Sequence, residues 1–197
     1  MMRLNRNPEA IELFERALGM SPKSISPALG LVLALLNVGN YARGREVLVS
    51  LRKRADIGNG RIRDQVLNLL ALTDAYLDDS DFVDEADVYS RELLKKNRRS
   101  INYNCTRGAV LVWIGKYNDG IRLLSKAYRR HSVSGARAVL AYWAALGEAR
   151  KGDNEQAKEW LGKALKNGLA ADLRQKAEVE IAERTAESCN TSVCTAN

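Results

Sequence analysis

Apolar residues recur at spacings of three and four along most of this 197-residue chain. Near the start, Ala10, Phe14 and Ala17 share one face of a predicted helix, and Pro22 ends it. The same period returns between short polar turns and predicts an all-α chain. Ten helices are expected, at about 8–20, 25–38, 41–55, 61–78, 82–97, 101–114, 117–131, 135–150, 154–167 and 170–187.

A short motif recurs at the turns between these helices. It combines a turn glycine, a polar residue and the start of a helix that alternates small and large apolar residues. The copies are Gly39-Asn40-Tyr41, Gly115-Lys116-Tyr117 and Gly152-Asp153-Asn154. A degenerate copy has Asp81-Phe82, with Ser80 where the glycine belongs, and Gly58-Asn59-Gly60 predicts a widened turn. Recurrence of this kind indicates a repeat protein.

These residues resemble the tetratricopeptide repeat, a helical hairpin of about 34 residues. The resemblance covers most of residues 8–168 and implies a right-handed α-solenoid of stacked antiparallel hairpins. We expect one repeat domain over residues 1–187, followed by a polar, flexible tail at 188–197. The approximate units are 8–24, 25–58, 66–99, 101–134 and 138–169, with a capping helix at 170–187.

In such a stack, the first helix of each unit lines the concave side. The register predicts a mostly apolar groove that binds a peptide or a helix of a partner protein. Alternatively, a tightly packed array buries the same side chains as core. The expected lining is Leu29, Leu33, Leu70, Asp74, Cys105, Ala109, Val112, Trp113, Tyr142 and Leu146.

The net charge is +7, and many of the cations cluster where second helices are expected to end. Repetition should align these clusters along one edge of the stack. Cations at a helix C-terminus complement its dipole by about 0.3–1 kcal/mol each, which accounts for them without a ligand. The alternative is a surface for nucleic acid or an acidic partner, although no aromatic residues are interleaved for base stacking. This basic edge comprises Arg52, Lys53, Arg54, Lys95, Lys96, Arg98, Arg99, Arg129 and Arg130.

Acidic residues crowd the segment from Asp78 to Asp87. The run lacks the glycine and the bidentate glutamate that a calcium loop requires. We therefore interpret Asp81, Asp84 and Glu85 as the cap and the first turn of a helix, where a negative charge is favourable.

The chain offers little for catalysis. His131 is the single histidine, so neither a histidine-based metal site nor a nucleophile–base set can be assembled. No glycine-rich phosphate loop precedes a helix. We expect no enzyme activity, no cofactor and no metal. Three cysteines are too few for a disulfide-built fold, although Cys189 and Cys194 could pair in an oxidising compartment.

Met1 to Pro8 does not have the composition of a signal peptide, and the longest apolar run, Leu29 to Val38, is about half the length of a membrane span. We expect a cytoplasmic protein that does not insert into membranes. The favoured function is a scaffold or adaptor that binds another protein. The alternatives are an anion-binding basic edge and a self-assembling module, in which the uncovered first hairpin stacks on a neighbouring molecule.

Overall fold

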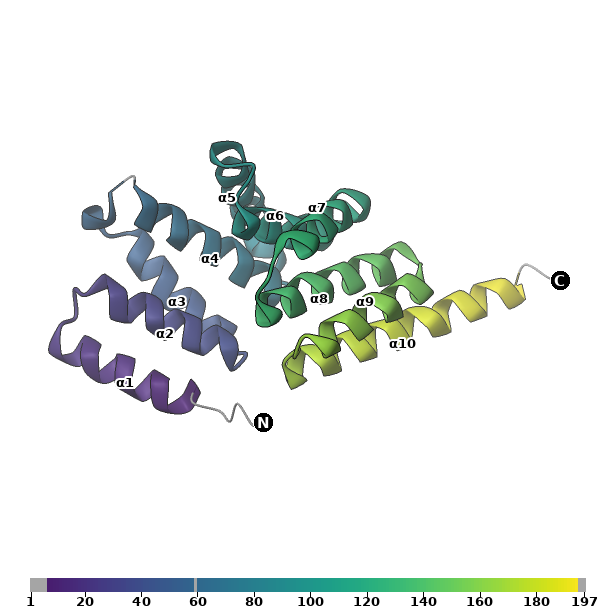
Figure 1. The fold of residues 1–197 in the computed structure, drawn as a ribbon, viewed down its shortest axis with the longest axis horizontal. Helices are drawn as coiled ribbons and strands as arrows, with labels where there is room; N and C mark the ends of the chain where they lie inside the picture. Colours follow the sequence, from purple (N-terminus) through teal and green to yellow (C-terminus); the bar gives the residue numbers. More distant parts are fainter. Residues whose placement is uncertain (1–6, 59, 195–197) are drawn as a thin grey trace. The chain divides into compact units, whose positions relative to one another are not determined.

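The computed structural model describes the backbone of residues 7–58 and 60–194. Within these ranges the chain forms ten α-helices, two short 3-10 helices and no strand, so the all-α prediction is confirmed (Figure 1). The helices are α1 (Asn7–Met20), α2 (Ile25–Asn37), α3 (Tyr41–Arg52), α4 (Arg61–Leu77), α5 (Val83–Lys96), α6 (Ile101–Trp113), α7 (Tyr117–Arg130), α8 (Ser134–Lys151), α9 (Asn154–Lys166) and α10 (Ala171–Cys194). The 3-10 helices are η1 (Ala55–Ile57) and η2 (Ser80–Phe82).

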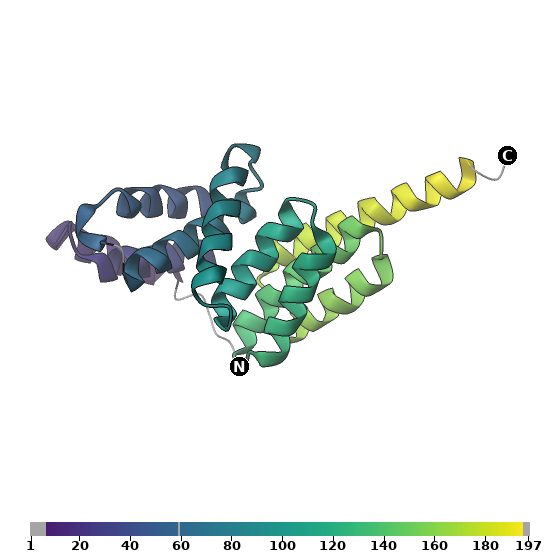
Figure 2. The same cartoon turned by 90° about the horizontal axis from the view of Figure 1, so that it is seen from above.

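The backbone forms two compact units, Met1–Leu93 and Leu94–Asn197, called unit 1 and unit 2 here. In unit 1, α1 packs on α2, α2 on α3 and α3 on α4. In unit 2, the helices from α6 to α9 pack in the same sequential manner, and α10 covers α8 and α9 (Figure 2). Packing between neighbours in sequence is the arrangement that a helical-hairpin repeat predicts. One repeat domain over residues 1–187 stays a prediction.

The recurring glycines end helices. Gly39, Gly115 and Gly152 have φ of 76°, 81° and 95°, the left-handed conformation that stops an α-helix and suits a residue without Cβ. After two of them, a polar side chain starts the next helix: Asn40 and Asp153 each accept a hydrogen bond from the backbone N–H three residues ahead, at 3.3 and 3.1 Å. The turn motif therefore encodes both a helix stop and a helix start.

The acidic turn between α4 and α5 has no glycine and reverses the chain differently. Asp78 itself takes the left-handed conformation, at φ 57°, which aspartate tolerates better than most residues. The carboxylate of Asp79 accepts a hydrogen bond from the N–H of Asp81 at 3.1 Å and opens η2. Asp79, rather than Asp81, is therefore the capping residue. Asp84 and Glu85 lie in the first turn of α5, as predicted.

Helix α10 continues to Cys194, whereas the sequence pattern predicted an end at residue 187. The added segment contains neither glycine nor proline, so nothing in it breaks the helix. Earlier in α10, Leu173, Ala177 and Ile181 are buried at a spacing of four. Arg150 of α8 also donates two hydrogen bonds to Glu180, at 2.5 and 3.2 Å, which ties α10 to unit 2. Residues 195–197 of the expected tail lie outside the described residues.

Small residues let α6 and α7 approach closely. A Cβ added at Gly120 would lie 2.8 Å from the carbonyl oxygen of Gly108 and 3.0 Å from the backbone nitrogen of Val112. A Cβ at Gly108 would lie 2.6 Å from Cγ of Leu124. At Gly120 the nearby backbone atoms cannot move aside as a flexible side chain does, and at Gly108 the buried Leu124 side chain fills the space.

We predict that Gly120→Ala lowers the free energy of unfolding by about 1–3 kcal/mol, because the new methyl group meets backbone atoms of α6. Gly162→Ala is the matched control, since a Cβ there meets nothing within 4 Å. That variant should raise the free energy by roughly 0.5–1 kcal/mol through helix propensity. Urea denaturation of both variants measures the difference. Equal effects of the two substitutions would contradict the close crossing.

Candidate functional site

The predicted groove residues of unit 1 divide into exposed and buried pairs. Leu33 of α2 is 46% exposed, and Leu29, one turn earlier, is partly exposed. Leu70 and Asp74 of α4 are both fully buried. Only the two leucines of α2 therefore offer surface to a partner in this unit.

Asp74 is held in a buried ion pair between α3 and α4. Its Oδ1 accepts a hydrogen bond from Nε of Arg45 at 2.7 Å, and the guanidinium carbon of Arg45 lies 3.3 Å from the centre of the Phe82 ring. The other carboxylate oxygen of Asp74 is buried without a hydrogen-bond partner in the described part of the chain. Burial raises the pKa of Asp74 to about 6, although Arg45 opposes that shift. The pair joins neighbouring helices.

In unit 2, most predicted groove residues belong to the core. Ala109, Val112, Tyr142 and Leu146 are buried, and the ring of Tyr142 packs edge-on against Trp143 at 5.4 Å between centroids. Trp113 and Cys105 keep part of their surface exposed.

The Cys105 thiol is poorly suited to chemistry at neutral pH. Burial raises its pKa to about 12, and a protonated thiol is neither a nucleophile nor a metal ligand. Among the residues of unit 2, Trp113 therefore offers the better contact for a partner, through apolar surface.

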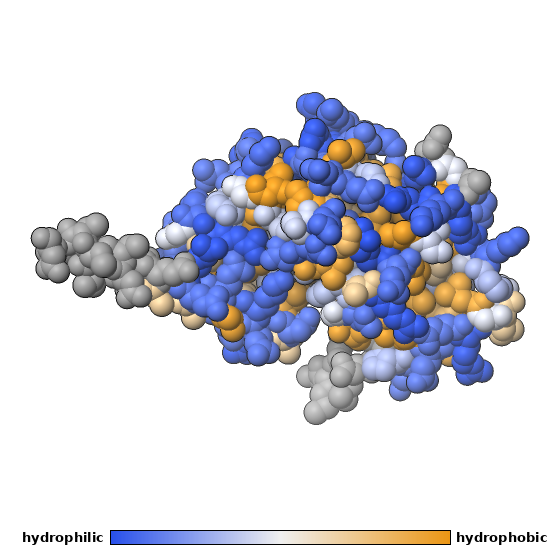
Figure 3. All heavy atoms as spheres, turned by 180° about the vertical axis from the view of Figure 1, so that it is seen from behind, coloured by the Kyte–Doolittle hydropathy of each residue, from blue (hydrophilic) through white to orange (hydrophobic). Residues whose placement is uncertain are grey.

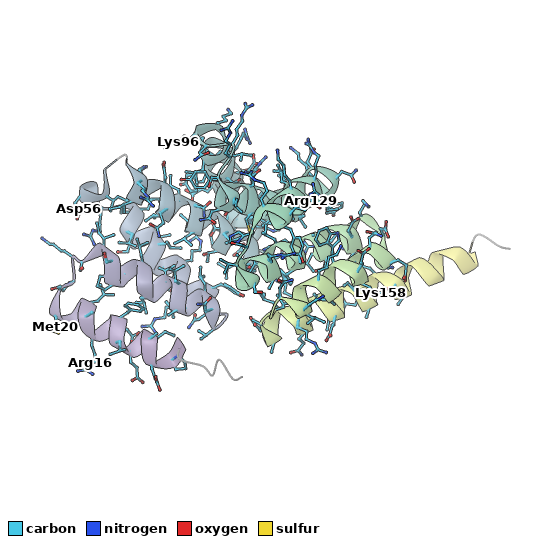
Figure 4. The ribbon with its side chains drawn as sticks, viewed as in Figure 1. Arg16, Met20, Asp56, Lys96, Arg129 and Lys158 are labelled. Carbon is cyan, nitrogen blue, oxygen red and sulfur yellow. The ribbon has the colours of Figure 1, made fainter. Side chains whose placement is uncertain are left out.

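A cleft of about 820 Å³ opens in unit 1 between α1, α2 and α3. Its volume is within the range of roughly 300–1,000 Å³ that is typical of ligand-binding pockets. Apolar side chains meet charged ones around it, and Figure 4 labels Asp56 beside it. The lining residues are Leu18, Pro22, Lys23, Ala28, Glu46, Val47, Ser50, Leu51, Arg54 and Asp56.

The charged rim of this cleft is fixed by hydrogen bonds. Arg54 binds both carboxylate oxygens of Asp56, at 3.0 and 2.6 Å, and donates to the carbonyl oxygen of Lys23 at 2.5 Å. The Arg54 guanidinium holds the pKa of Asp56 below its ordinary value. These bonds connect the end of α3 to the turn between α1 and α2. The rim is therefore organised before any partner arrives.

Sequence reasoning did not find this cleft. Its lining comes from α1, α2, α3 and the turns beside them, and includes the small residues Ala28 of α2 and Ser50 of α3. Small residues in a helix allow close packing at a crossing, and nothing in the local sequence shows where two helices leave a gap instead. The hydrophobic period shows which face of each helix is apolar. It does not show how far apart α1 and α3 lie, because that distance depends on tertiary packing.

The first of the predicted basic clusters is engaged within unit 1. Arg52 binds Glu85 at 2.8 Å and also hydrogen-bonds the hydroxyl of Tyr89, which raises the pKa of its guanidinium. Arg54 is committed to the cleft rim. Lys53 between them is exposed. Two of these three cations are therefore occupied by intramolecular partners.

The two later clusters come together in unit 2. Nη2 of Arg130, at the end of α7, donates to the carbonyl oxygen of Arg99, in the turn before α6, at 3.3 Å. This contact follows from the antiparallel packing of α6 on α7, which brings the start of one helix beside the end of the other. Figure 4 labels one residue of each cluster, Lys96 and Arg129. The exposed cations here are Lys95, Lys96, Arg98, Arg99, Arg129 and Arg130.

Helix α1 is the least covered helix of unit 1. None of its residues from 8 to 20 is fully buried, and Met20 and Leu13 are 87% and 61% exposed. On the face of the molecule in Figure 3, hydrophilic residues dominate and apolar areas lie between them. Such areas are ordinary on protein surfaces. Self-association through the first hairpin stays a prediction.

The described residues contain no group of three or more His, Cys, Asp and Glu side chains that could hold a metal ion. No helix in that part of the chain is both long enough and apolar enough to cross a membrane. The absence of enzyme activity and the cellular compartment stay predictions.

Solved structures share this arrangement of helices. TTC0263, a thermophilic tetratricopeptide protein in Thermus thermophilus, is similar over 90% of this chain and 91% of its own, with a TM-score of 0.61 and 20% identity. MamA AMB-1 is similar over 82% of this chain and 89% of its own, with a TM-score of 0.50 and 22% identity. No protein-family model matches the sequence, and no curated protein matches it. The chain therefore has the tetratricopeptide-repeat solenoid fold in a divergent sequence, as the resemblance implied.

The buried Asp74 makes the stability of the fold depend on pH. The folded chain binds the Asp74 proton up to about pH 6, whereas the unfolded chain loses it near the ordinary pKa of 3.8. Asp74 therefore stabilises the fold fully below pH 3.8, and this stabilisation is lost as the pH rises through about 6. Asn at position 74 cannot titrate, so the Asp74→Asn variant serves as the reference. We predict that the difference in free energy of unfolding, wild type minus variant, falls by roughly 1–3 kcal/mol between pH 3.8 and about 6.

Urea denaturation at several pH values measures this difference. Asp84→Asn, which removes an exposed carboxylate of α5, is the control for the loss of one negative charge. A difference between wild type and Asp74→Asn that is constant with pH would contradict the buried, titrating carboxylate.

Proposed function

We propose that this chain is a protein-interaction scaffold and that unit 1 captures a short segment of a partner protein in the cleft between α1 and α3. The observation that carries the proposal is the cleft itself, about 820 Å³ in volume, with apolar side chains beside a fixed charged rim. Support for a scaffold also comes from the fold, because helical-repeat proteins offer extended binding surfaces along their stacked helices.

The lining of the cleft indicates the chemistry of the bound segment. Leu18, Val47 and Leu51 provide apolar surface, which favours a partner that inserts one or two apolar side chains. Lys23 and Glu46 carry opposite charges at the edge, so they suit a segment whose flanking residues are polar. An amphipathic helix or an extended peptide with apolar anchors meets both requirements.

The predicted concave groove belongs to the same proposal through its exposed members. In unit 1, Leu29 and Leu33 of α2 have apolar surface for a partner, and in unit 2 Trp113 of α6 does. Leu29 packs against the buried cluster that contains Leu70. We take the cleft as the primary docking site, because it has a defined volume and a fixed rim.

Blocking the cleft tests the proposal. Ser50 is exposed on α3 and lines the cleft, so Ser50→Trp should fill it without disturbing the core. Ala42→Trp is the matched control, because Ala42 is also exposed on α3 and lies outside the lining. Peptides selected from a random phage-displayed library against the full chain are the probes. We predict that Ser50→Trp weakens their binding by at least about tenfold and that Ala42→Trp changes it less than about twofold.

Fluorescence anisotropy with the labelled peptides measures both affinities. Failure to select any peptide, or equal binding to the wild type and to Ser50→Trp, would contradict capture in the cleft. A third variant, Leu33→Asp, places a charge on the exposed face of α2. Loss of binding in Leu33→Asp with full binding in Ser50→Trp would move the docking site to the predicted groove.

A further inference from the structure

Two turns of unit 2 carry a cluster of exposed cations that the cleft does not use. Lys95, Lys96, Arg98 and Arg99 end α5 and form the turn before α6, and Arg129 and Arg130 end α7. The bond from Arg130 to the Arg99 carbonyl holds the two turns side by side. These six residues are called the cationic edge below.

The turn that carries Arg98 and Arg99 is held by side chains around it. The amide oxygen of Asn97 accepts hydrogen bonds from the N–H groups of Arg99 and Ser100, both at 3.1 Å. The amide nitrogen of Asn104, a buried residue of α6, donates to the carbonyl oxygens of Arg98 and Ser100, at 3.0 and 2.6 Å. A fixed backbone loses less conformational entropy when the turn binds a partner. The two guanidinium groups therefore extend into solvent from an ordered support.

Stabilisation of helix ends accounts for only part of this cluster. Lys95, Lys96 and Arg129 lie in the last turns of α5 and α7, where the helix dipole favours a cation. Arg98 and Arg99 instead precede the N-terminus of α6, where the dipole disfavours a positive charge. No acidic residue lies in the first turn of α6 or of α8 to offset them. Two arginines are thus kept at an electrostatic cost to the fold.

Among the described residues, five cations of this edge also lack carboxylate partners, unlike many other cations in unit 2. In the described part of the chain, Lys95, Arg98, Arg99, Arg129 and Arg130 form no ion pair with a carboxylate. Elsewhere in unit 2, cations are neutralised by nearby acids, in the pairs Arg122–Asp119, Lys151–Glu148, Lys158–Glu155 and Lys163–Glu159. The two turns therefore place five cations, without carboxylate partners in the part of the chain that the structure describes, on one edge of unit 2.

Two aromatic residues of unit 2 are engaged by cations. Arg137 lies 4.2 Å from the centre of the Tyr128 ring, which also packs edge-on with the ring of Trp160 at 5.4 Å. The ammonium of Lys163 lies 4.2 Å from the Trp160 ring. A cation therefore already occupies one face of each of these rings, where a nucleic-acid base would otherwise stack. Four arginines, in contrast, provide planar forks that match carboxylates.

We propose that the cationic edge of unit 2 is a second docking surface, which binds an acidic segment of a partner protein, rich in Asp and Glu. The surface belongs to the other unit and shares no residue with the cleft. A scaffold with two such sites holds an apolar segment at one and an acidic segment at the other. The acidic site does not depend on the cleft being occupied.

Charge reversal tests this surface on the full-length chain. The probe is a short fluorescein-labelled peptide of alternating Glu and Ser residues, titrated at low and at physiological salt. Arg99→Glu with Arg129→Glu should weaken binding about tenfold or more, because two unpaired guanidinium groups of the edge are lost. The matched control is Lys116→Glu with Arg122→Glu, an equal change in net charge near the start of α7, where both residues are exposed.

The control pair should bind the peptide within about twofold of wild type, and Ser50→Trp should bind it unchanged. Thermal unfolding by circular dichroism should show that both double variants fold, because Arg99 contributes only backbone groups to the turn and Arg129 is exposed. No peptide binding by the wild type at low salt would overturn the proposal, and so would equal losses in both double variants. Tighter binding of oligo(dT) or of duplex DNA than of the peptide, with the same dependence on Arg99 and Arg129, would make the edge a nucleic-acid surface and would likewise overturn it.

Discussion

In the described part of the chain, helices bury their apolar faces mainly against helices one or two places away in sequence, and that constraint controls the rest of the structure. It requires small residues at crossings, as at Gly108 and Gly120, where a methyl group would meet backbone atoms. It also requires a helix stop of fixed geometry, which Gly39, Gly115 and Gly152 supply with positive φ. Where α1, α2 and α3 do not close up, a cleft remains.

Ion pairs between helices likewise join helices that pack against each other. Arg45 pairs with Asp74 across α3 and α4, and Arg150 pairs with Glu180 across α8 and α10. Pairs of this kind add specificity to helix docking, although desolvation offsets much of their attraction. Lys95, Arg98, Arg99, Arg129 and Arg130 of the cationic edge form no such pair in the described part of the chain, in contrast to the engaged Arg52 and Arg54 of unit 1.

The sequence predicted the helices well because their signals are local. Glycine, a capping residue and a period of three to four fixed most helix ends within a few residues, and α10 ran further because nothing in it stops a helix. The groove was less predictable. Tyr142 and Leu33 fall on expected groove positions with the same periodicity, yet one is buried and the other is 46% exposed. Whether a residue is buried depends on the helices that pack over it, and the sequence of its own helix does not specify these. The cleft likewise depends on the spacing between helices.

Amide hydrogen exchange of the native chain, followed by mass spectrometry or NMR, tests the neighbour-to-neighbour account most directly. Helix α8 is buried without interruption from Leu140 to Ala149, whereas α1 has no fully buried residue from 8 to 20. Local opening free energies follow such differences in burial. The account predicts the slowest exchange in α8 and much faster exchange in α1. Protection of α1 as strong as that of α8 would contradict it.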